Sequence, residues 1–170
     1  MKLTPLTKKF VLHWGEMGTR WGINRTVAQV HALLYIAPRP LHAEEIAETL
    51  SVARSNVSTS LKELQNWGLV KVSHVLGDRR DHFETHKDVW QMFQIVMNER
   101  KRREIEPTVA LLREAVSETD SEGKDDDVAR ERLKAMLEFF EDASRCYEQV
   151  RKLSPAAMRQ MAKLAGTLAK

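Results

Sequence analysis

The sequence has little that would hold the protein in a membrane or outside the cell. Cys146 is its one cysteine, which excludes an internal disulfide bond and fits a reducing compartment. Apolar runs are short: none approaches the roughly 18 residues of a membrane-spanning helix, and the run at residues 10–12 is too short for a signal peptide. We therefore expect a cytoplasmic protein.

The sequence also lacks the motifs of common enzyme classes. It contains no glycine-rich phosphate-binding loop, no Ser-x-Gly type nucleophile turn and no cluster of metal-ligating residues. Its six histidines include no helical pair four residues apart with a carboxylate partner. We therefore expect no enzymatic activity, no cofactor and no bound metal, which leaves binding as the expected role.

Glycine and proline are scarce as well, at seven and five residues, so most of the chain should be helical. Apolar residues at helical spacing, with capping residues at the ends, predict four helices, at residues 7–20, 25–36, 42–50 and 53–67. After these helices, the spacing of apolar residues changes from helical to partly alternating. Residues rich in β-branched side chains predict two strands, at 69–76 and 82–86, joined by a polar turn.

Helices return after this hairpin. Asp88 can cap the first of them, and Pro107 should break or kink it because proline disfavours helical geometry in the preceding residue. The remaining predicted boundaries are helix ends near residues 104 and 116, an exposed acidic linker without apolar residues at 117–127, a helix at 127–153 and a final short helix that begins at Ser154–Pro155.

The order helix, turn, helix, hairpin is that of a winged helix-turn-helix. We therefore predict a mainly α fold with a small β-hairpin wing at residues 1–100, followed by a helical dimerisation region at residues 101–170. On the helix at 53–67, helical spacing places the apolar side chains on one face and small polar side chains with one lysine on the other. Small polar side chains let a helix enter the major groove of DNA closely. A polar surface without a partner is the alternative.

The predicted hairpin tip carries Arg79 and Arg80 between two aspartates. Arginines on such a wing can enter a minor groove or bind phosphates, and Asp78 can brace one of them. Taken alone, the tip could equally be a charged turn that is simply solvated. Its place directly after the polar-faced helix favours the DNA-binding interpretation.

The run LSVARSNVSTSLKELQNWGLVKV, followed by GDRRDHFETHKDVW, resembles the MarR-type winged-helix repressors. The upstream run HWGEMGTRWGINRTVAQVHALLYIA is similar to the GbsR branch of these regulators, and the resemblance covers about residues 8–100. It implies a homodimer that binds double-stranded DNA, with a recognition helix at 53–67 and with Asp78 and Arg80 in the position of a family Asp-x-Arg. Many such units have Gly where this chain has Ser51.

The resemblance also assigns the candidate DNA contacts. Arg54 begins the recognition helix and is expected to bind a phosphate. The other expected contacts are Ser55, Asn56, Ser58, Thr59, Lys62, Arg79 and Arg80. Ala53 replaces a frequent Ser at the helix start, so this helix should be capped poorly or by Ser51.

The helix predicted at 127–153 carries apolar residues that alternate in steps of four and three. Such a seam can pair two chains or pack inside one chain, and we favour the dimer. The residues expected at the dimer interface are Leu133, Met136, Phe140, Ala143, Tyr147 and Val150. Two recognition helices related by a two-fold axis would read a pseudopalindromic operator.

Several interpretations stay open at this level. A winged helix can also serve as a protein-interaction module without DNA binding. A small-molecule effector of unknown identity could change the spacing of the two recognition helices. Tryptophans 14 and 21 would share a helix face and could form a cage for a cation, although core packing is the favoured alternative. Cys146 is expected to pack near the apolar stripe rather than to act as a redox switch.

Overall fold

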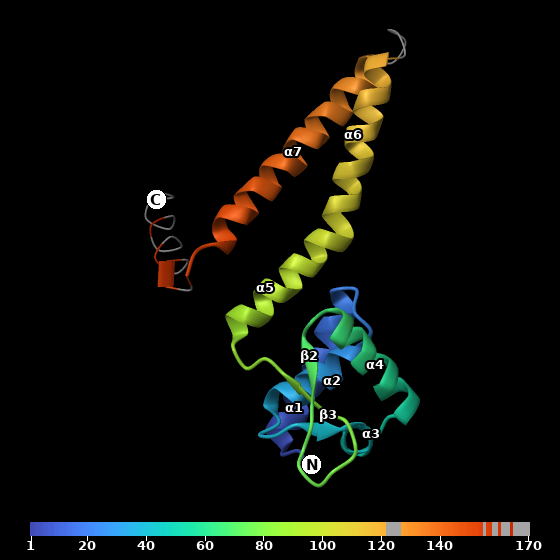
Figure 1. Ribbon diagram of the computed structural model, residues 1–170, viewed down its shortest axis with the longest axis vertical. Helices are drawn as coiled ribbons and strands as arrows, with labels where there is room; N and C mark the ends of the chain where they lie inside the picture. Colours follow the sequence, from blue (N-terminus) through green and yellow to red (C-terminus); the bar gives the residue numbers. More distant parts are fainter. Residues whose placement is uncertain (122–126, 155, 158–159, 161–163, 165–170) are drawn as a thin grey trace. The chain divides into compact units, whose positions relative to one another are not determined.

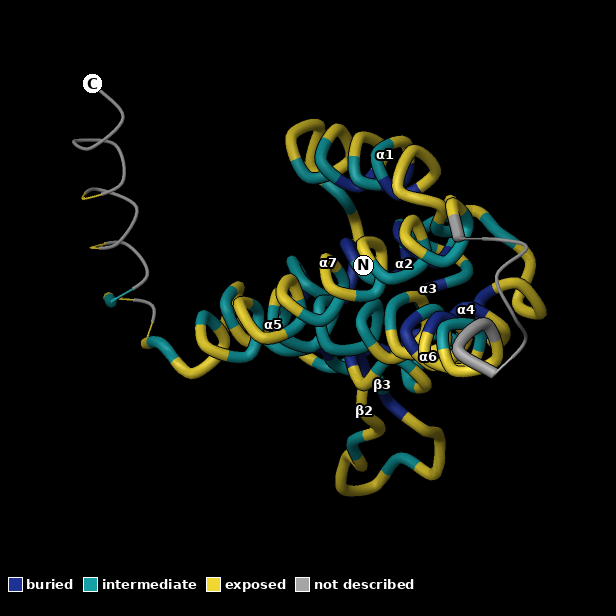
Figure 2. Tube along the Cα trace, turned by 90° about the horizontal axis from the view of Figure 1, so that it is seen from above, coloured by how far each residue is buried: buried dark blue, intermediate teal, exposed yellow. Residues whose placement is uncertain are grey.

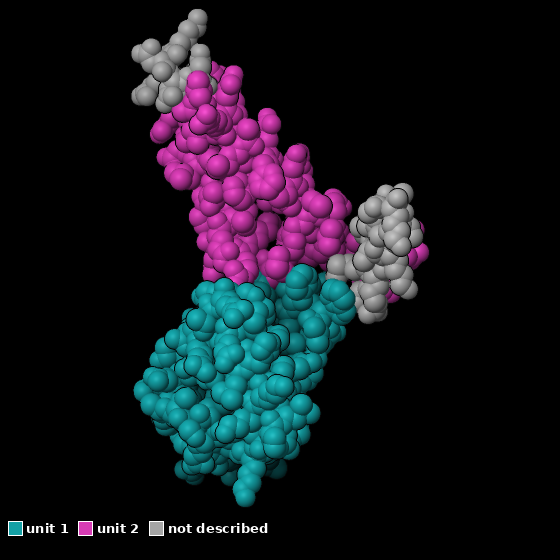
Figure 3. Space-filling model, turned by 180° about the vertical axis from the view of Figure 1, so that it is seen from behind, with its two compact units in different colours: residues 1–96 teal, residues 97–170 magenta. Residues whose placement is uncertain are grey.

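Two units make up the structure, a computed structural model that describes residues 1–121, 127–154, 156–157, 160 and 164. Unit 1 comprises residues 1–96 and unit 2 comprises residues 97–170 (Figure 3). None of the described helices is both long and apolar enough to cross a membrane.

Unit 1 holds four helices and a small sheet before the first part of a fifth helix. Its elements are α1 (Pro5–Arg20), α2 (Arg25–Ile36), β1 (Leu41–His42), α3 (Ala43–Leu50), α4 (Arg54–Asn66), β2 (Val70–Ser73), β3 (His82–Thr85) and the start of α5 (Val89–Arg100). The predicted helices and the hairpin are thus confirmed, with strands shorter than expected.

Side-chain caps fix where the first two helices begin. The Thr4 hydroxyl accepts from the backbone N–H of Thr7 at 3.2 Å, and Pro5 occupies the first turn of α1. The Asn24 side chain accepts from the backbone N–H of Thr26 at 2.8 Å and begins α2. At the start of α4, Ala53 makes no side-chain cap, so the expected poor capping is confirmed and Ser51 does not replace it.

The core of unit 1 lies between α2, α3 and α4. Its most deeply buried large side chains are Val30, Leu33, Leu34, Leu41, Ile46 and Val57. α1 packs closely on α2 because Gly18 has no side chain: a Cβ there would lie 2.5 Å from the Cβ of Ala28. This packing holds α4 in position, with its outer face exposed to solvent.

The sheet has three antiparallel strands in the order β1-β3-β2. In the hairpin, Val72 pairs with Phe83 and Ser73 pairs with His82, while Leu41 of β1 pairs with Phe83 on the other side. β1 was not predicted, because two residues after a proline are too few to show strand alternation. Its effect is to tie the hairpin to the start of α3.

Ser51 turns the chain between α3 and α4. Its backbone lies in the left-handed region, with φ 54°, and it is the one non-glycine residue with positive φ among the described residues. Its backbone N–H still ends α3 by donating to the Glu48 carbonyl at 3.3 Å. The turn therefore keeps a conformation that glycine would adopt with less strain.

Unit 2 is a long helical hairpin. From Met97 onward it contains the rest of α5, a π-helical turn η1 (Lys101–Ile105), α6 (Glu106–Ser121) and α7 (Asp127–Arg151). α6 and α7 run side by side in opposite directions (Figure 1). An ion pair joins them, with Arg113 Nη2 at 2.7 Å from Glu141 Oε1.

Three predicted boundaries in unit 2 need correction. The helix is interrupted by the π-helical turn directly before α6 rather than by a break at Pro107, and helical residues lie on both sides of the proline. The linker prediction is wrong for residues 117–121, which continue α6; residues 122–126 lie outside the described residues. α7 ends at Arg151, and the Ser154 hydroxyl accepts from the Ala157 N–H at 3.2 Å, although Pro155 lies outside the described residues.

Candidate nucleic-acid interface

The outer face of α4 is polar and accessible. Val57, Leu61 and Leu64 point into the core, as the spacing predicted. The exposed residues of the helix are Arg54, Ser55, Asn56, Ser58, Thr59, Lys62 and Asn66. The Thr59 hydroxyl donates to the Ser55 carbonyl at 3.1 Å, so the hydroxyl group stays close to the helix backbone.

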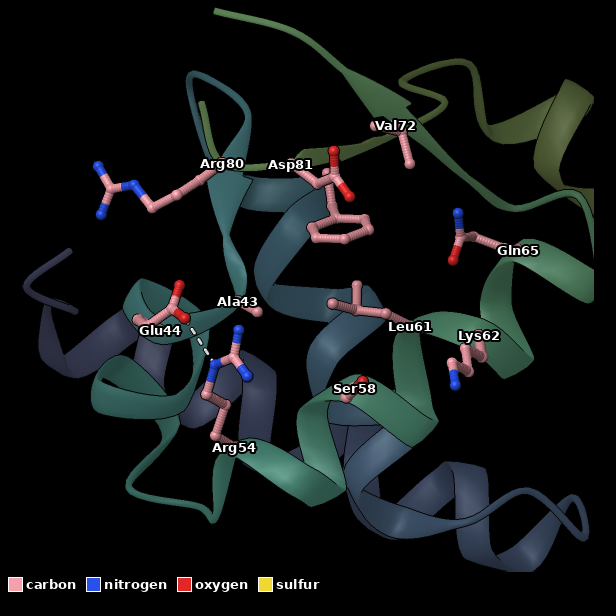
Figure 4. A pocket seen from close by; sticks show the side chains of 11 residues that line it. Ala43, Glu44, Arg54, Ser58, Leu61, Lys62, Gln65, Val72, Arg80 and Asp81 are labelled. Atoms are coloured by element: carbon pink, nitrogen blue, oxygen red, sulfur yellow. Dashed lines mark hydrogen bonds and ion pairs between the residues drawn. The ribbon is translucent and has the colours of Figure 1, made fainter. Parts of the chain in front are cut away.

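A cleft of about 320 Å³ separates α4 from the hairpin (Figure 4). Arg54, Ser58 and Lys62 line it from α4, and Val72 and Asp81 line it from the hairpin side. Leu61 and Phe83 form its apolar floor. The arrangement brings the candidate helix and the candidate wing to one side of unit 1.

Arg54 is held at the entrance of this cleft by Glu44 of α3. Arg54 Nε lies 2.5 Å from Glu44 Oε1, and Glu44 Oε2 lies 3.1 Å from His42 Nδ1. The hydrogen bonds from its own backbone N–H and from Arg54 lower the pKa of Glu44. Both side chains of the ion pair are well exposed, so a phosphate could replace the carboxylate at small cost.

The hairpin tip is braced as the sequence suggested. The Asp78 carboxylate accepts from Arg80 Nε at 2.9 Å and from Arg80 Nη2 at 2.5 Å, and it also accepts from the backbone N–H of Arg80 at 3.0 Å. These bonds from the Arg80 side chain and backbone hold the pKa of Asp78 well below its usual range. Arg80 points away from α4 in Figure 4.

Arg79 differs from its neighbour. It is exposed and forms no hydrogen bond or ion pair with any residue that the structure describes. Lys62 is likewise exposed and without such a partner among the described residues. These two cations are therefore available to an anionic ligand without breaking an internal pair.

Two contacts that hold the wing in place were not predicted from the sequence. Lys87 Nζ donates to three carbonyls at the end of α2, those of Leu34 and Tyr35 at 2.7 Å and of Ala37 at 2.9 Å. A cation favours the negative end of a helix dipole. Thr85 of β3 donates to the Leu69 carbonyl at 2.6 Å. A lysine two residues before a helix gives no sequence signal of such a contact.

The seam residues on α7 are divided between two environments. Leu133, Phe140, Tyr147 and Val150 are half-buried, and Met136 and Ala143 are exposed. The Tyr147 hydroxyl donates to Asn98 Oδ1 at 2.8 Å, and Lys101 Nζ lies 2.8 Å from Glu148 Oε1. Packing within the chain thus uses part of the apolar stripe and leaves the rest uncovered.

Cys146, two tryptophans and two histidines are the other side chains with a candidate role. Cys146 is exposed, so its predicted packing against the apolar stripe is wrong: residue 146 lies beside the seam and faces outward on α7. The rings of Trp14 and Trp21 lie edge to face with centroids 5.7 Å apart. The rings of His42 and His82 also lie edge to face, with centroids 5.6 Å apart. The described residues contain no group of three or more potential metal ligands.

Comparison with known proteins agrees with this geometry. Residues 21–81 match the model of the MarR family, a span that runs from α2 through the hairpin tip. The HTH-type transcriptional repressor GbsR of Bacillus subtilis (strain 168) is 25% identical over 138 residues, which are 79% of this chain and 76% of that protein. The chain is thus similar to MarR-type regulators over this span and to GbsR over most of its length. A crystal structure of a transcriptional regulator shares its fold, with a TM-score of 0.60 and 22% identity over 85% of this chain and 99% of that one.

The span that matches the MarR model contains every candidate DNA contact. In this chain, α3 and α4 form the helix-turn-helix, and β2 and β3 form the wing; the matched span ends directly before β3. The GbsR-like similarity extends beyond this span over most of the chain. These similarities support the winged-helix fold, while the DNA contacts of individual residues remain predictions.

Proposed function

We propose that this protein is a transcription repressor that binds double-stranded DNA in a sequence-specific manner. The proposal rests on one observation. The exposed face of small polar side chains on α4 and a wing that bears an unpaired arginine lie on the same side of unit 1. A helix with such a face fits the major groove, and the wing then lies over the neighbouring backbone and minor groove. The relative named as a repressor supports the direction of regulation.

The roles of the side chains follow from their chemistry. Ser55, Asn56, Ser58 and Thr59 can exchange hydrogen bonds with base edges and backbone oxygens. Arg54, Lys62, Arg79 and Arg80 supply the positive charge that attracts the phosphates. Arg54 would exchange Glu44 for a phosphate on binding, whereas Arg80 would stay braced by Asp78.

We further propose that the protein acts as a homodimer through unit 2. Phe139 and Met136 on α7 are 66% and 51% exposed, which is costly for large apolar side chains in water. A groove of about 330 Å³ beside them is lined mainly by apolar and aromatic side chains, among them Met97, Ile105, Phe140 and Tyr147. A second copy would cover this surface, and a two-fold axis would then relate the two copies of α4. This symmetry predicts a pseudopalindromic operator.

The dimer is tested by sedimentation of the full chain. The wild-type protein should sediment at twice the mass of one chain. Phe139→Asp should reduce this to one chain mass, because it places a charge in the interface, whereas Phe139→Leu should remain dimeric. A monomeric wild-type protein, or a Phe139→Asp variant that stays dimeric, would contradict this part of the proposal.

DNA binding is tested by selecting fragments of sheared genomic DNA with the purified protein. The proposal predicts enrichment of one pseudopalindrome by the wild type and its loss in the Arg79→Ala/Arg80→Ala variant. The variant Lys8→Ala/Lys9→Ala removes the same charge from exposed positions on α1 and should still enrich it. Absence of enrichment by a folded, dimeric wild type at low salt would reject DNA binding and favour the alternative, a winged helix that binds another protein.

A further inference from the structure

The tip of the wing, residues 74–81, is a structured loop rather than a loose one. The backbone N–H of Asp78 donates to the Val75 carbonyl at 3.0 Å, and Gly77 has φ +84°, which together form a β-turn with Leu76 at its first corner. The bonds between Arg80 and Asp78 close a second turn directly after it. Leu76 is therefore presented at a fixed place on the hairpin.

Leu76 is the most exposed large apolar residue of the described chain, at 104% of its reference surface. Its neighbour Val75 is 43% exposed. Figure 2 shows this loop projecting from the helices of unit 1, with its tip drawn as exposed. The side chain makes no contribution to the core, so any apolar contact that it forms must be with another molecule.

The charge around the tip indicates what that molecule is. Arg79 lies on the same loop, exposed and without a partner among the described residues, and Arg80 is exposed beside it. An apolar side chain next to an unpaired arginine fits the DNA minor groove, whose walls are sugar C–H groups and whose floor concentrates negative potential. A purely apolar protein surface would leave the cation of Arg79 unpaired on burial.

We propose that Leu76 is an apolar wedge that enters the minor groove beside Arg79 and bends the operator DNA. The inference rests on the proposed function of the wing and extends it, because it assigns an apolar contact to the tip. A wedge at the flank of each half-site pushes neighbouring bases apart at flexible pyrimidine–purine steps. The wing would then select sequence at base pairs whose edges it does not touch.

The test compares Leu76→Ala with wild type on a duplex of about 30 base pairs that carries the selected operator, long enough for two half-sites one turn apart. Leu6→Ala is the matched control, since Leu6 is 77% exposed on α1. Half-burial of one leucine corresponds to about a five-fold effect per wing, so Leu76→Ala should bind about 25-fold more weakly as a dimer. The dependence of affinity on salt should not change, because no charge is removed.

Bending is measured on the same duplex by energy transfer between dyes at its two ends. Wild type and Leu6→Ala should shorten the end-to-end distance, and Leu76→Ala should shorten it less. Equal affinity and equal bending by wild type and Leu76→Ala would overturn the wedge while leaving DNA binding in place. Loss of the dimer in Leu76→Ala would overturn it in favour of a contact between copies, and a wild type that does not bind DNA would reject the proposed function together with the wedge.

Discussion

His31 should make the stability of unit 1 depend on pH. His31 Nε2 lies 3.2 Å from the Thr85 hydroxyl oxygen. The one proton of that hydroxyl is donated to the Leu69 carbonyl, so His31 must supply the proton in its own bond to Thr85. Burial lowers the pKa of His31 to about 4 from its usual 6.5, and the nearby charges of His86 and Lys87 add to this.

The sign and size of the effect follow from this depressed pKa. The folded state binds fewer protons than the unfolded state, so the free energy of unfolding falls as pH falls through 6.5 toward 4. Between pH 7 and pH 5, the two pKa values predict a loss of about 2 kcal/mol from His31 alone. Above pH 7 this group should have little further effect.

Urea unfolding at pH 7 and pH 5, at one fixed chain concentration, measures the loss. His31→Gln keeps a donor for Thr85 but cannot be protonated, so its unfolding free energy should fall about 2 kcal/mol less than that of wild type over this range. His74→Gln, at an exposed hairpin position, should behave like wild type. If wild type and His31→Gln lose the same free energy, the reasoning is refuted.

Three further substitutions test the packing that supports the site, each by its thermal or urea midpoint. Ser51→Gly should stabilise the protein by about 0.5–1 kcal/mol, because φ 54° strains any residue with a Cβ, and an unchanged midpoint would contradict this. Lys87→Met should destabilise by about 2 kcal/mol through loss of three hydrogen bonds at the end of α2; a neutral result would mean that water replaces the ammonium. Gly18→Ala should destabilise by about 2 kcal/mol because its Cβ would meet that of Ala28 at 2.5 Å, and a stabilised variant would show that the helices can separate.

Sequence patterns predicted the parts of the fold that depend on local spacing. The apolar period of α4 placed Val57, Leu61 and Leu64 in the core and left the polar face outside. The change from helical to alternating period located the hairpin, and Asp78 was foreseen as a brace for an arginine. These features were predictable because one segment of chain determines each of them.

Features that depend on distant segments were not predicted. The contact of Lys87 with α2 joins residues more than 50 positions apart, and the ion pair of Glu44 with Arg54 depends on the angle between α3 and α4. β1 is too short for a pattern, and it forms because Leu41 pairs with Phe83. The stripe on α7 could not distinguish packing within one chain from pairing of two chains, because both require the same spacing.

The central claim is that the wing and α4 bind DNA through their unpaired cations. It is tested most directly by the salt dependence of operator affinity for wild type, Arg79→Ala and the control Arg132→Ala, which removes an exposed arginine from α7. One lost contact in each half of a dimer should reduce the slope of log K against log salt by about 2, and Arg132→Ala should leave it unchanged. An Arg79→Ala slope equal to that of wild type, or equal reductions in both variants, would contradict the account.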